Sequence, residues 1–318
     1  MTLQQLRYLI AVAERGSMTE AAKSLFISQP SLSNAIKEVE RNVGFRIFNR
    51  SRSGITLTAK GMEFLGYARQ VVQQMDILES KYGGVSDPKQ RFCVSTQHYT
   101  FTANAFVELV KEYGREQYDF MLNETQTHQI IEDVRNRFSD LGVLYLSRAN
   151  TRVLTAEFTR NDVEFHALFD VHPHVFLRRG HPLAQYGHVS LKDLRRYPKL
   201  GFIQGRYESA DYAEDPFNGV DSDRTIHVSD RAAIENLMIG LDGYTIATGI
   251  LPNRLHGDDI ISLPLDEDER MRIGYITNKG QTLSELSTTY IDKLRRYGKS
   301  ADEARTESKP IATNYPKA

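Results

Sequence analysis

The feature that most limits the fold of this chain is a change of pattern at residues 83–90, which read "GGVSDPKQ". Before this segment, apolar residues recur every three or four positions, as they do on one face of a helix. From Arg91 onward, short apolar runs alternate with helical patterns. Glycine, serine and proline in the segment itself favour a hinge. Since 318 residues also exceed the usual size of a single core, we predict a helical N-terminal unit and an α/β C-terminal unit.

Residues 4–43 show helical periodicity with two interruptions. Gly16 stops the first run, and "SMTE" at residues 17–20 has the spacing of a capping box, in which serine and glutamate each bond the other's backbone. After "FI", Ser28 is a second N-cap, and Pro30 falls in the first helical turn, where its missing N–H is not needed. Helices are therefore expected at Gln4–Arg15, Met18–Leu25 and Gln29–Val43.

The third predicted helix has one apolar edge and one edge of small polar groups. Four apolar residues recur at helical spacing and should face the core, namely Leu32, Ala35, Ile36 and Val39. The other edge presents two rows, Gln29, Ser33 and Lys37 in one and Pro30, Asn34 and Arg41 in the other. Such side chains read base edges or hold phosphates in a nucleic-acid groove. An ordinary solvated helix face is the alternative.

The distribution of charge and a predicted hairpin also favour binding of an anionic partner. Residues 1–60 carry nine Lys/Arg and four Asp/Glu, a net charge of +5 in a chain whose total is −1. A basic head on an acidic body suggests an anionic partner for the head alone. Two short strands, Phe45–Phe48 and Ile55–Leu57, are expected around a turn that bears Arg50 and Arg52. Beside a helix-turn-helix, such a hairpin is a wing that can hold phosphates; a commonplace basic turn is the alternative.

A long helix follows the hairpin. Thr58 can cap it, and no proline or glycine after Gly66 interrupts the run before Tyr82. At ~1.5 Å per residue, a helix of roughly 24 residues is a rod of roughly 36 Å. Its apolar positions alternate by three and four in the manner of a coiled-coil seam, which makes candidate dimerisation residues of Leu65, Ala68, Val72 and Met75. A helix packed on its own domain is the alternative.

Residues 6–61 resemble the winged helix-turn-helix of LysR-type transcriptional regulators. The shared features are the paired Ala21 and Ala22, "SQPSLS" at the start of the third helix, "GFRIFNR" after it and "LTAKG" before the long helix. Two features depart from the family pattern. Met18 stands where the family often has phenylalanine, and "KEVER" replaces the commoner Arg-Leu-Glu. Neither changes a residue needed for DNA contact.

The resemblance implies a DNA-binding domain over residues 1–58, and a dimerising linker helix with its hinge over residues 59–87. It also implies double-stranded DNA as a partner and a homodimer, commonly assembled to a homotetramer. The residues expected to read or line the major groove are Gln29, Pro30, Ser31, Ser33 and Asn34. Those expected to contact the DNA backbone are Lys37, Arg50 and Arg52.

The pattern after Arg91 predicts α/β sheets, with strands at residues 91–96, 118–124, 140–146, 163–169, 174–179 and 244–248. Helices are expected at Phe101–Tyr113, Thr127–Phe138, Ser229–Ile239 and Ser284–Tyr297. Ligands of such folds bind near the C-terminal ends of strands. The last residues, 298–318, are polar and contain two prolines, which predicts a disordered tail.

Three segments of this unit resemble the effector domain of the same family: "DLGVLYL", "HPLA" and "GYTIATGILP". The fold that this thinner resemblance implies is that of periplasmic solute-binding proteins, two α/β lobes with a cleft between them. Lobe one would comprise residues 88–161 and 265–297, and lobe two residues 162–264. The chain would cross between the lobes near Asn161 and Leu265.

A small polar or anionic metabolite is the expected ligand of that cleft. Hydroxyls, amides and helix N-termini that follow the strands can hold such a molecule. The expected effector-binding residues are Thr96, Gln97, Thr100, Thr125, Gln204, Thr248 and, as a counter-charge, Arg206. Helix capping is the alternative role for each serine and threonine there.

Catalytic and metal functions have little support in the sequence. It contains no P-loop, nucleophile elbow or zincin histidine pair. Cys93 is the single cysteine, so neither an internal disulfide nor a thiolate cluster can form. Five histidines lack acidic or thiol partners at ligand spacing, namely His166, His172, His174, His181 and His188. We therefore expect no catalytic residue, no cofactor and no metal.

No segment approaches the roughly 18 consecutive apolar residues of a membrane span, and charged residues interrupt the N-terminus. A cytoplasmic protein without a membrane partner is expected. Taken with the motifs, this favours a ligand-responsive, sequence-specific DNA-binding transcriptional regulator. The first alternative is a metabolite-binding protein with only nonspecific DNA affinity, and the second is a catalytic α/β protein.

Overall fold

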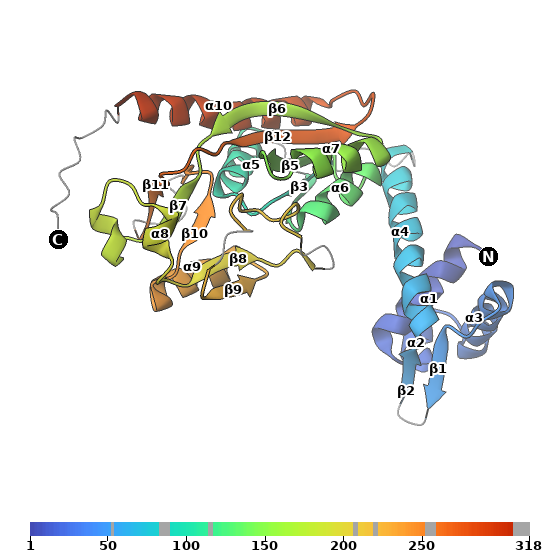
Figure 1. Cartoon of the computed structure of the whole chain (residues 1–318). Helices are drawn as coiled ribbons and strands as arrows, with labels where there is room; N and C mark the ends of the chain where they lie inside the picture. Colours follow the sequence, from blue (N-terminus) through green and yellow to red (C-terminus); the bar gives the residue numbers. More distant parts are fainter. Residues whose placement is uncertain are drawn as a thin grey trace. The chain divides into compact units, whose positions relative to one another are not determined.

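The computed structural model describes residues 1–51, 54–82, 90–113, 117–205, 209–218, 222–251 and 259–307. The chain forms two compact units, Met1–Pro88 and Lys89–Ala318 (Figure 1). The boundary between the units falls within the predicted hinge. No helix of the described ranges is long and apolar enough to cross a membrane.

Unit one begins with three short helices, α1 (Leu3–Arg15), α2 (Met18–Ser24) and α3 (Gln29–Val43). Gly16 ends α1 in the left-handed conformation, at the stop that the sequence predicted, and Gly44 ends α3 in the same way. Ser17 caps α2 by accepting from the backbone N–H of Glu20, but the Glu20 carboxylate pairs with Lys23 at 2.9 Å. The predicted capping box is therefore only half formed. A complete box closes the start of α1 instead, between Thr2 and Gln5.

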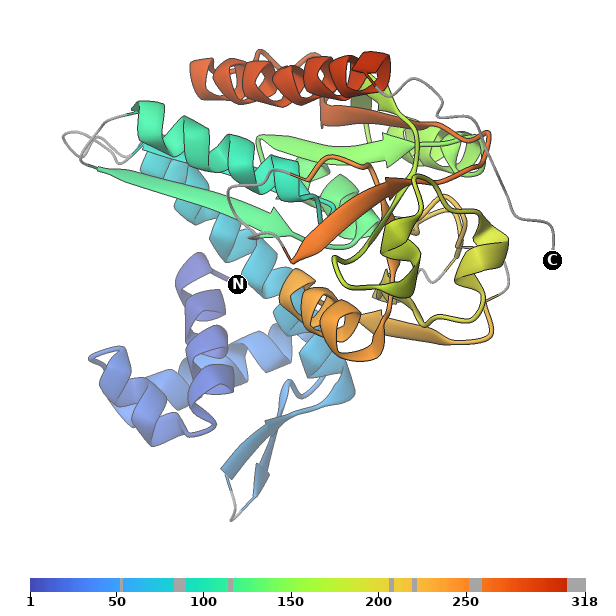
Figure 2. The same ribbon diagram turned by 90° about the vertical axis from the view of Figure 1, so that its left-hand side faces the viewer.

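The hairpin consists of β1 (Phe48–Ser51) and β2 (Gly54–Leu57), and it projects from the helices of unit one (Figure 2). The prediction that its first strand covers Phe45–Phe48 was wrong. Oε1 of Glu40 on α3 accepts the backbone N–H groups of Ile47 at 2.8 Å and Phe48 at 3.1 Å. Because these bonds hold the segment against α3, the strand begins only at Phe48.

The last helix of unit one is α4 (Ala59–Tyr82). As predicted, Thr58 caps it: Oγ1 accepts the N–H of Gly61 at 2.9 Å. Leu65 and Ala68 are only 2% exposed and belong to the core that α1, α2 and α3 also form. Their assignment to a dimer seam was wrong, because α4 uses this edge to cover the apolar face of its own domain. Val72 also packs against this core, and Met75 is half-buried.

Lobe one of unit two is a five-stranded sheet with helices on both faces. Its strands are β3 (Gln90–Thr96), β4 (Tyr118–Glu124), β5 (Leu141–Leu146), β6 (Val163–Val171) and β12 (Met271–Asn278), in the order β4-β3-β5-β12-β6. Its helices are α5 (Thr100–Tyr113), α6 (Thr127–Arg135), α7 (Thr151–Arg160) and α10 (Glu285–Glu307). The first three strands are mutually parallel, and β12 runs antiparallel to β5 and β6.

β5 shows why this sheet could be predicted from an unbroken apolar run. Its side chains alternate between two core clusters, Val143 and Tyr145 facing α5 and α10, and Leu144 and Leu146 facing α6 and α7. A strand covered on both faces has no polar side, so it reads as continuously apolar.

Lobe two contains two smaller sheets. One has the order β10-β7-β11 and the other pairs β8 with β9 in parallel. The strands are β7 (His174–Arg178), β8 (Lys199–Phe202), β9 (Thr225–Val228), β10 (Thr245–Ala247) and β11 (Ile260–Pro264). The helices are η1 (Pro182–Gln185), α8 (Leu191–Leu194) and α9 (Arg231–Leu241).

The predicted first crossing between the lobes and the predicted start of the tail were wrong, whereas the predicted return to lobe one was close. The chain does not leave lobe one near Asn161, because β6 pairs with β12 along its whole length and crosses out only after Val171. The return, predicted near Leu265, lies between that residue and Met271. The expected tail is helical up to Glu307, since α10 continues through residues rich in helix-forming alanine, glutamate and arginine. Residues 308–318 lie outside the described part.

Candidate functional site

The exposed edge of α3 is the candidate DNA-reading face. The side chains of Gln29, Pro30, Ser31, Asn34 and Lys37 are all exposed. Ser28 caps the helix and lies 2.7 Å from the Ser31 hydroxyl, Oγ to Oγ. The face therefore offers side-chain amides, which both donate and accept hydrogen bonds, and one cation along successive helical turns, next to a helix N-terminus.

Ser33 does not belong to this face. Ser33 is only 8% exposed, which contradicts the prediction that it lines the major groove of DNA. In a helix with 3.6 residues per turn, Ser33 follows Leu32 directly and precedes Ile36 by one turn, and both of these are fully buried. The side chain therefore lies on the flank that turns toward the core.

The wing predictions remain predictions. Arg50 lies on β1, but its side chain and the whole of Arg52 fall outside the described part. What the structure adds is the anchoring of the wing: the Ile55 N–H donates to the carbonyl of Gly16 at 3.1 Å. This bond ties the hairpin to the turn before α2.

A second apolar edge of α4, missed in the sequence, faces solvent within unit one. We call Tyr67, Val71 and Leu78 the outer stripe; they are 63%, 51% and 51% exposed. At 100° per residue these positions lie close together on the helix, roughly 120° around the axis from the buried Leu65 and Ala68. The heptad-like pattern of α4 thus contains two interleaved apolar edges, and the predicted dimerisation residues lie on the more buried of the two.

A cavity lies in unit two where the start of α5 in lobe one meets lobe two. Its empty volume is about 850 Å³, part of it open solvent. Lobe one contributes three consecutive residues at the end of the first strand, His98, Tyr99 and Thr100. Lobe two supplies an apolar wall that includes Phe176, Phe202, Ile234, Met238, Ile246 and Leu251. The charged residues of the lining are Glu214, Asp215, Arg231 and Glu235.

Two of the predicted effector residues, Thr100 and Thr248, line this cavity. The Thr100 hydroxyl donates to the carbonyl of Ile250 at 3.1 Å, and Thr248 accepts the N–H of the same residue at 3.4 Å. Arg206 lies outside the described residues. The other four, Thr96, Gln97, Thr125 and Gln204, are absent from the lining.

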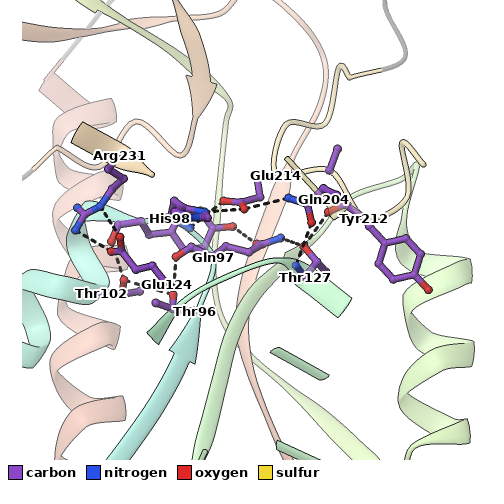
Figure 3. A network of polar contacts seen from close by, with 12 residues as sticks. Thr96, Gln97, His98, Thr102, Glu124, Thr127, Gln204, Tyr212, Glu214 and Arg231 are labelled. Atoms are coloured by element: carbon purple, nitrogen blue, oxygen red, sulfur yellow. Dashed lines mark hydrogen bonds and ion pairs between the residues drawn. The ribbon is translucent and has the colours of Figure 1, made fainter. Parts of the chain in front are cut away.

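These other residues are bonded within the protein instead, and one of them, Gln204, bonds across the lobes to Thr127 (Figure 3). Gln97 donates to the Thr127 hydroxyl at 2.6 Å, and that hydroxyl donates to the carbonyl of Tyr212 at 2.8 Å. Oε1 of Gln204 accepts the N–H of Thr127 at 3.1 Å. Thr125 donates its N–H to the carbonyl of Thr96 at 2.9 Å. Because Gln97 and Gln204 are buried and bonded within the protein, their amides are already committed.

Within the described part of unit two, His98 and Glu214 form the most enclosed ionisable contact between the lobes. Both backbone and ring of His98 bond the carboxylate, N to Oε2 and Nδ1 to Oε1, each at 2.8 Å. The two side chains are 5% and 7% exposed, and the His98 ring stacks on Phe202 with centroids 3.9 Å apart. Burial lowers the pKa of His98, but the hydrogen bond and charge of Glu214 outweigh burial, so the pKa is raised overall.

A second ion pair joins the lobes at the opposite side of His98 in Figure 3. Arg231, at the start of α9, contacts Glu124, at the end of β4, through Nε at 2.8 Å and Nη2 at 2.7 Å. Such a two-pronged contact fixes the guanidinium plane. Neither His98, Glu214 nor Arg231 was predicted. Glu214 lies in an irregular segment whose local sequence carries no pattern, so only the fold brings it to the cavity.

The described residues contain no group of three or more His, Cys, Asp or Glu side chains placed to hold a metal ion.

Comparison with known proteins identifies the family of the chain. Residues 3–62 match the model "Bacterial regulatory helix-turn-helix protein, lysR family", and residues 93–299 match "LysR substrate binding domain". The chain belongs to the LysR family. This LysR-family protein is thus a DNA-binding transcriptional regulator whose second unit is an effector-binding domain.

Individual relatives are distant. The chain is 29% identical over 216 residues to the "Uncharacterized HTH-type transcriptional regulator YvbU" of Bacillus subtilis (strain 168), covering 66% of this chain and 68% of that protein. It is 22% identical over 306 residues to the "Hydrogen peroxide-inducible genes activator" of Pectobacterium carotovorum subsp. carotovorum, covering 93% and 97%.

Among solved structures, full-length CbnR complexed with its target DNA matches with a TM-score of 0.64 at 20% identity, covering 93% of this chain and all (100%) of that one. At this identity the match shows a shared fold. It agrees with the expected architecture of a helix-turn-helix unit followed by an α/β effector domain.

Proposed function

We propose that this LysR-family regulator recognises a small set of DNA sites through the exposed face of α3, and that a small molecule in the cavity between its lobes alters that binding. The observation that carries the proposal is the exposure of Gln29 and Asn34 on adjacent turns, beside Lys37. Amide side chains can contact adenine through two hydrogen bonds, whereas a lysine on the same face can hold a phosphate. The protein would act in the cytoplasm, without catalysis.

Dimerisation belongs to the same proposal. Two copies of the chain would pair through the outer stripe of Tyr67, Val71 and Leu78, since a row of half-exposed apolar side chains along a helix is stabilised by a matching row. Paired reading heads would then recognise an interrupted inverted repeat. Dimers would further assemble to tetramers.

Peroxide sensing, named for one relative, is not part of the proposal. Cys93 is the only cysteine of the chain, and burial raises the pKa of its thiol to about 11. A thiol with that pKa stays protonated near neutral pH, and the protonated form is a poor nucleophile toward an oxidant.

The test is selection of fragmented host genomic DNA by the purified full chain at near-physiological salt, followed by sequencing. We expect a few recovered sites that contain an interrupted inverted repeat. Asn34→Ala should weaken binding to those sites roughly tenfold to a hundredfold and relax the preference at one base position. Lys37→Ala should weaken binding to all DNA sequences by a similar factor and make binding less dependent on salt.

Asn42→Ala is the matched control, since Asn42 is also exposed on α3 but lies in its last turn, away from the helix start. It should leave site affinity unchanged. Uniform recovery of genomic fragments, lost on modest addition of salt, would support the alternative of a metabolite-binding protein with only nonspecific DNA affinity.

A further inference from the structure

The turn between α2 and α3 contains a phenylalanine in an unusual backbone conformation. Phe26 has a φ of 54°, in the left-handed region. Two hydrogen bonds close the turn: the N–H of Phe26 donates to the carbonyl of Lys23 and the N–H of Ile27 to that of Ala22, each at 3.1 Å. This is the Schellman arrangement, in which the left-handed position is usually occupied by glycine and sometimes by asparagine.

A large side chain at this position has a cost that packing does not offset. The left-handed conformation brings the Cβ atom of an L-residue too close to the following carbonyl oxygen. The other described non-glycine residues with a positive φ are all polar, namely Arg137, Asp162 and Asp242. Phe26 is 96% exposed, so its ring contributes almost nothing to the core of unit one. A residue that is both strained and exposed is characteristic of a functional contact.

Phe26 also lies next to the proposed DNA-reading face. It precedes Ser28, the N-cap of α3, by two residues. Because consecutive Cα atoms are ~3.8 Å apart, the Cα of Phe26 lies within about 11 Å of that of Gln29, the first residue of α3. In helix-turn-helix proteins, the residues at the start of the recognition helix contact base edges. The ring is therefore close to the part of α3 that would enter the major groove.

A base edge suits this ring better than a protein surface does. In residues 3–43, all of which the structure describes, Phe26 is the only exposed large hydrophobic residue, and the exposed residues around it include Lys23, Ser28 and Gln29. Protein interfaces have a core of several apolar side chains. In the major groove, by contrast, thymine presents a single apolar group, its 5-methyl, among hydrogen-bond donors and acceptors. One apolar ring beside amide side chains is complementary to that pattern.

We propose that Phe26 is a specificity-determining residue, whose ring packs against the 5-methyl group of a thymine at the edge of the sequence that α3 reads. The inference rests on the proposed function, because it takes α3 as the DNA-reading helix. It adds to the hydrogen bonds of Gln29 and Asn34 a contact that depends on apolar surface alone. The regulator should therefore prefer thymine at one position of each half-site.

Deoxyuridine tests this contact, since it pairs with adenine as thymidine does and lacks only the 5-methyl group. The probe is a duplex that contains one site recovered by the genomic selection. Each thymine of one half-site is replaced in turn, and the affinity of the full chain is measured by fluorescence anisotropy at fixed salt. We expect one replacement to weaken binding roughly threefold to tenfold, because the ring then loses a methyl contact.

Two variants assign the effect to the ring. Phe26→Asn should bind the thymine site more weakly by a similar factor and should bind the thymine and uracil versions equally. Its thermal unfolding midpoint should be unchanged or higher, because asparagine tolerates the left-handed conformation and no packing is lost. Lower affinity would then not reflect unfolding. Phe26→Tyr keeps the ring and should keep the preference for thymine.

Tyr186→Asn is the matched control. Tyr186 is an aromatic residue of unit two that is 51% exposed. Its substitution removes an exposed ring from a part of the chain that the proposal does not place on DNA. Both the affinity for the site and the preference for thymine over uracil should stay as they are in the unmodified chain.

The outcomes separate this inference from the proposed function. Equal sensitivity to uracil in the unmodified chain and in Phe26→Asn overturns the thymine contact and leaves DNA reading by α3 intact. Weaker binding of Phe26→Asn with an unchanged preference for thymine also overturns it, and would assign the ring to the DNA backbone or to a second protein. Recovery of no specific site in the genomic selection overturns the proposed function and this inference together.

Discussion

Gly61 and Gly66 lie five positions apart on α4, yet a side chain would meet very different surroundings at each. A Cβ atom at Gly61 would lie 2.1 Å from the carbonyl oxygen of Ile47 and 2.9 Å from its Cα. These are backbone atoms that hydrogen bonds from Thr58 to Ile47 and from Ile47 to Glu40 hold in place. A Cβ at Gly66 would have no atom within 4 Å.

We therefore expect Gly61→Ala to lower the free energy of unfolding of unit one by about 1–3 kcal/mol or more, because the wing must move away from α4. Gly66→Ala should raise it by roughly 0.5–1 kcal/mol, since alanine is the better helix former at an exposed position. Chemical unfolding of the two variants beside the unmodified chain checks both signs. Similar effects of the two substitutions would contradict the contact with Ile47.

Single residues also mark where sequence reasoning reaches its limit. Ser28, Gly16 and Thr58 could be assigned as helix ends because capping depends on neighbours within a few positions. Ser33 could not be placed, since a small polar residue at the border of a helix face suits either side. Glu214 carried no signal, because its role depends on His98, a residue more than a hundred positions away.

At the scale of elements, α4 shows that periodicity identifies a face but not its partner. The seam through Leu65 and Ala68 was correctly recognised as apolar, yet its partner is α1 and the rest of unit one. The same limit holds for strands. The pattern of β6 predicts a strand, but alternation along one strand does not say to which sheet it belongs. The predicted lobe boundary therefore lies about ten residues too early.

The outer stripe gives a prediction at this scale. If it pairs two copies, Leu78→Glu places a charge opposite apolar side chains and should weaken self-association at least roughly tenfold. Met62→Glu is the control: Met62 is 64% exposed on the same helix, roughly 160° around the axis from the outer stripe. Sedimentation equilibrium of the variants measures the change. Unaltered association of Leu78→Glu would exclude the stripe as the dimer contact.

For the whole molecule, the contact between His98 and Glu214 links the closure of the lobes to pH. The pKa of His98 is raised above its ordinary 6.5, because Glu214 and Glu124 outweigh the opposing effects of burial and Arg231. A raised folded-state pKa means that stabilisation is complete below the unfolded-state value and is lost as pH rises through the folded-state value.

His98→Asn should therefore lower the thermal unfolding midpoint most below pH 6.5, with a difference from the unmodified chain that shrinks as pH rises. Burial lowers the pKa values of His174 and His181, so these two histidines change stability with pH in the opposite direction. Both proteins contain them, and their contribution therefore cancels in the difference between the two unfolding midpoints. Unfolding scans of both proteins across this range provide the test. A gap that stays constant or widens with pH would rule out the ion pair as its source.

The pairing of β6 with β12 has a consequence for how such a regulator can change over evolutionary time. Val171 and Met271 are register partners, so the chain enters and leaves lobe two at neighbouring positions, about 5 Å apart. Residues 172–270 are thus an insertion at a single point of lobe one, and they contribute most of the cavity wall. Substitution or exchange within this one stretch can give the cavity a new chemistry without altering a residue of α3, the proposed DNA-reading helix.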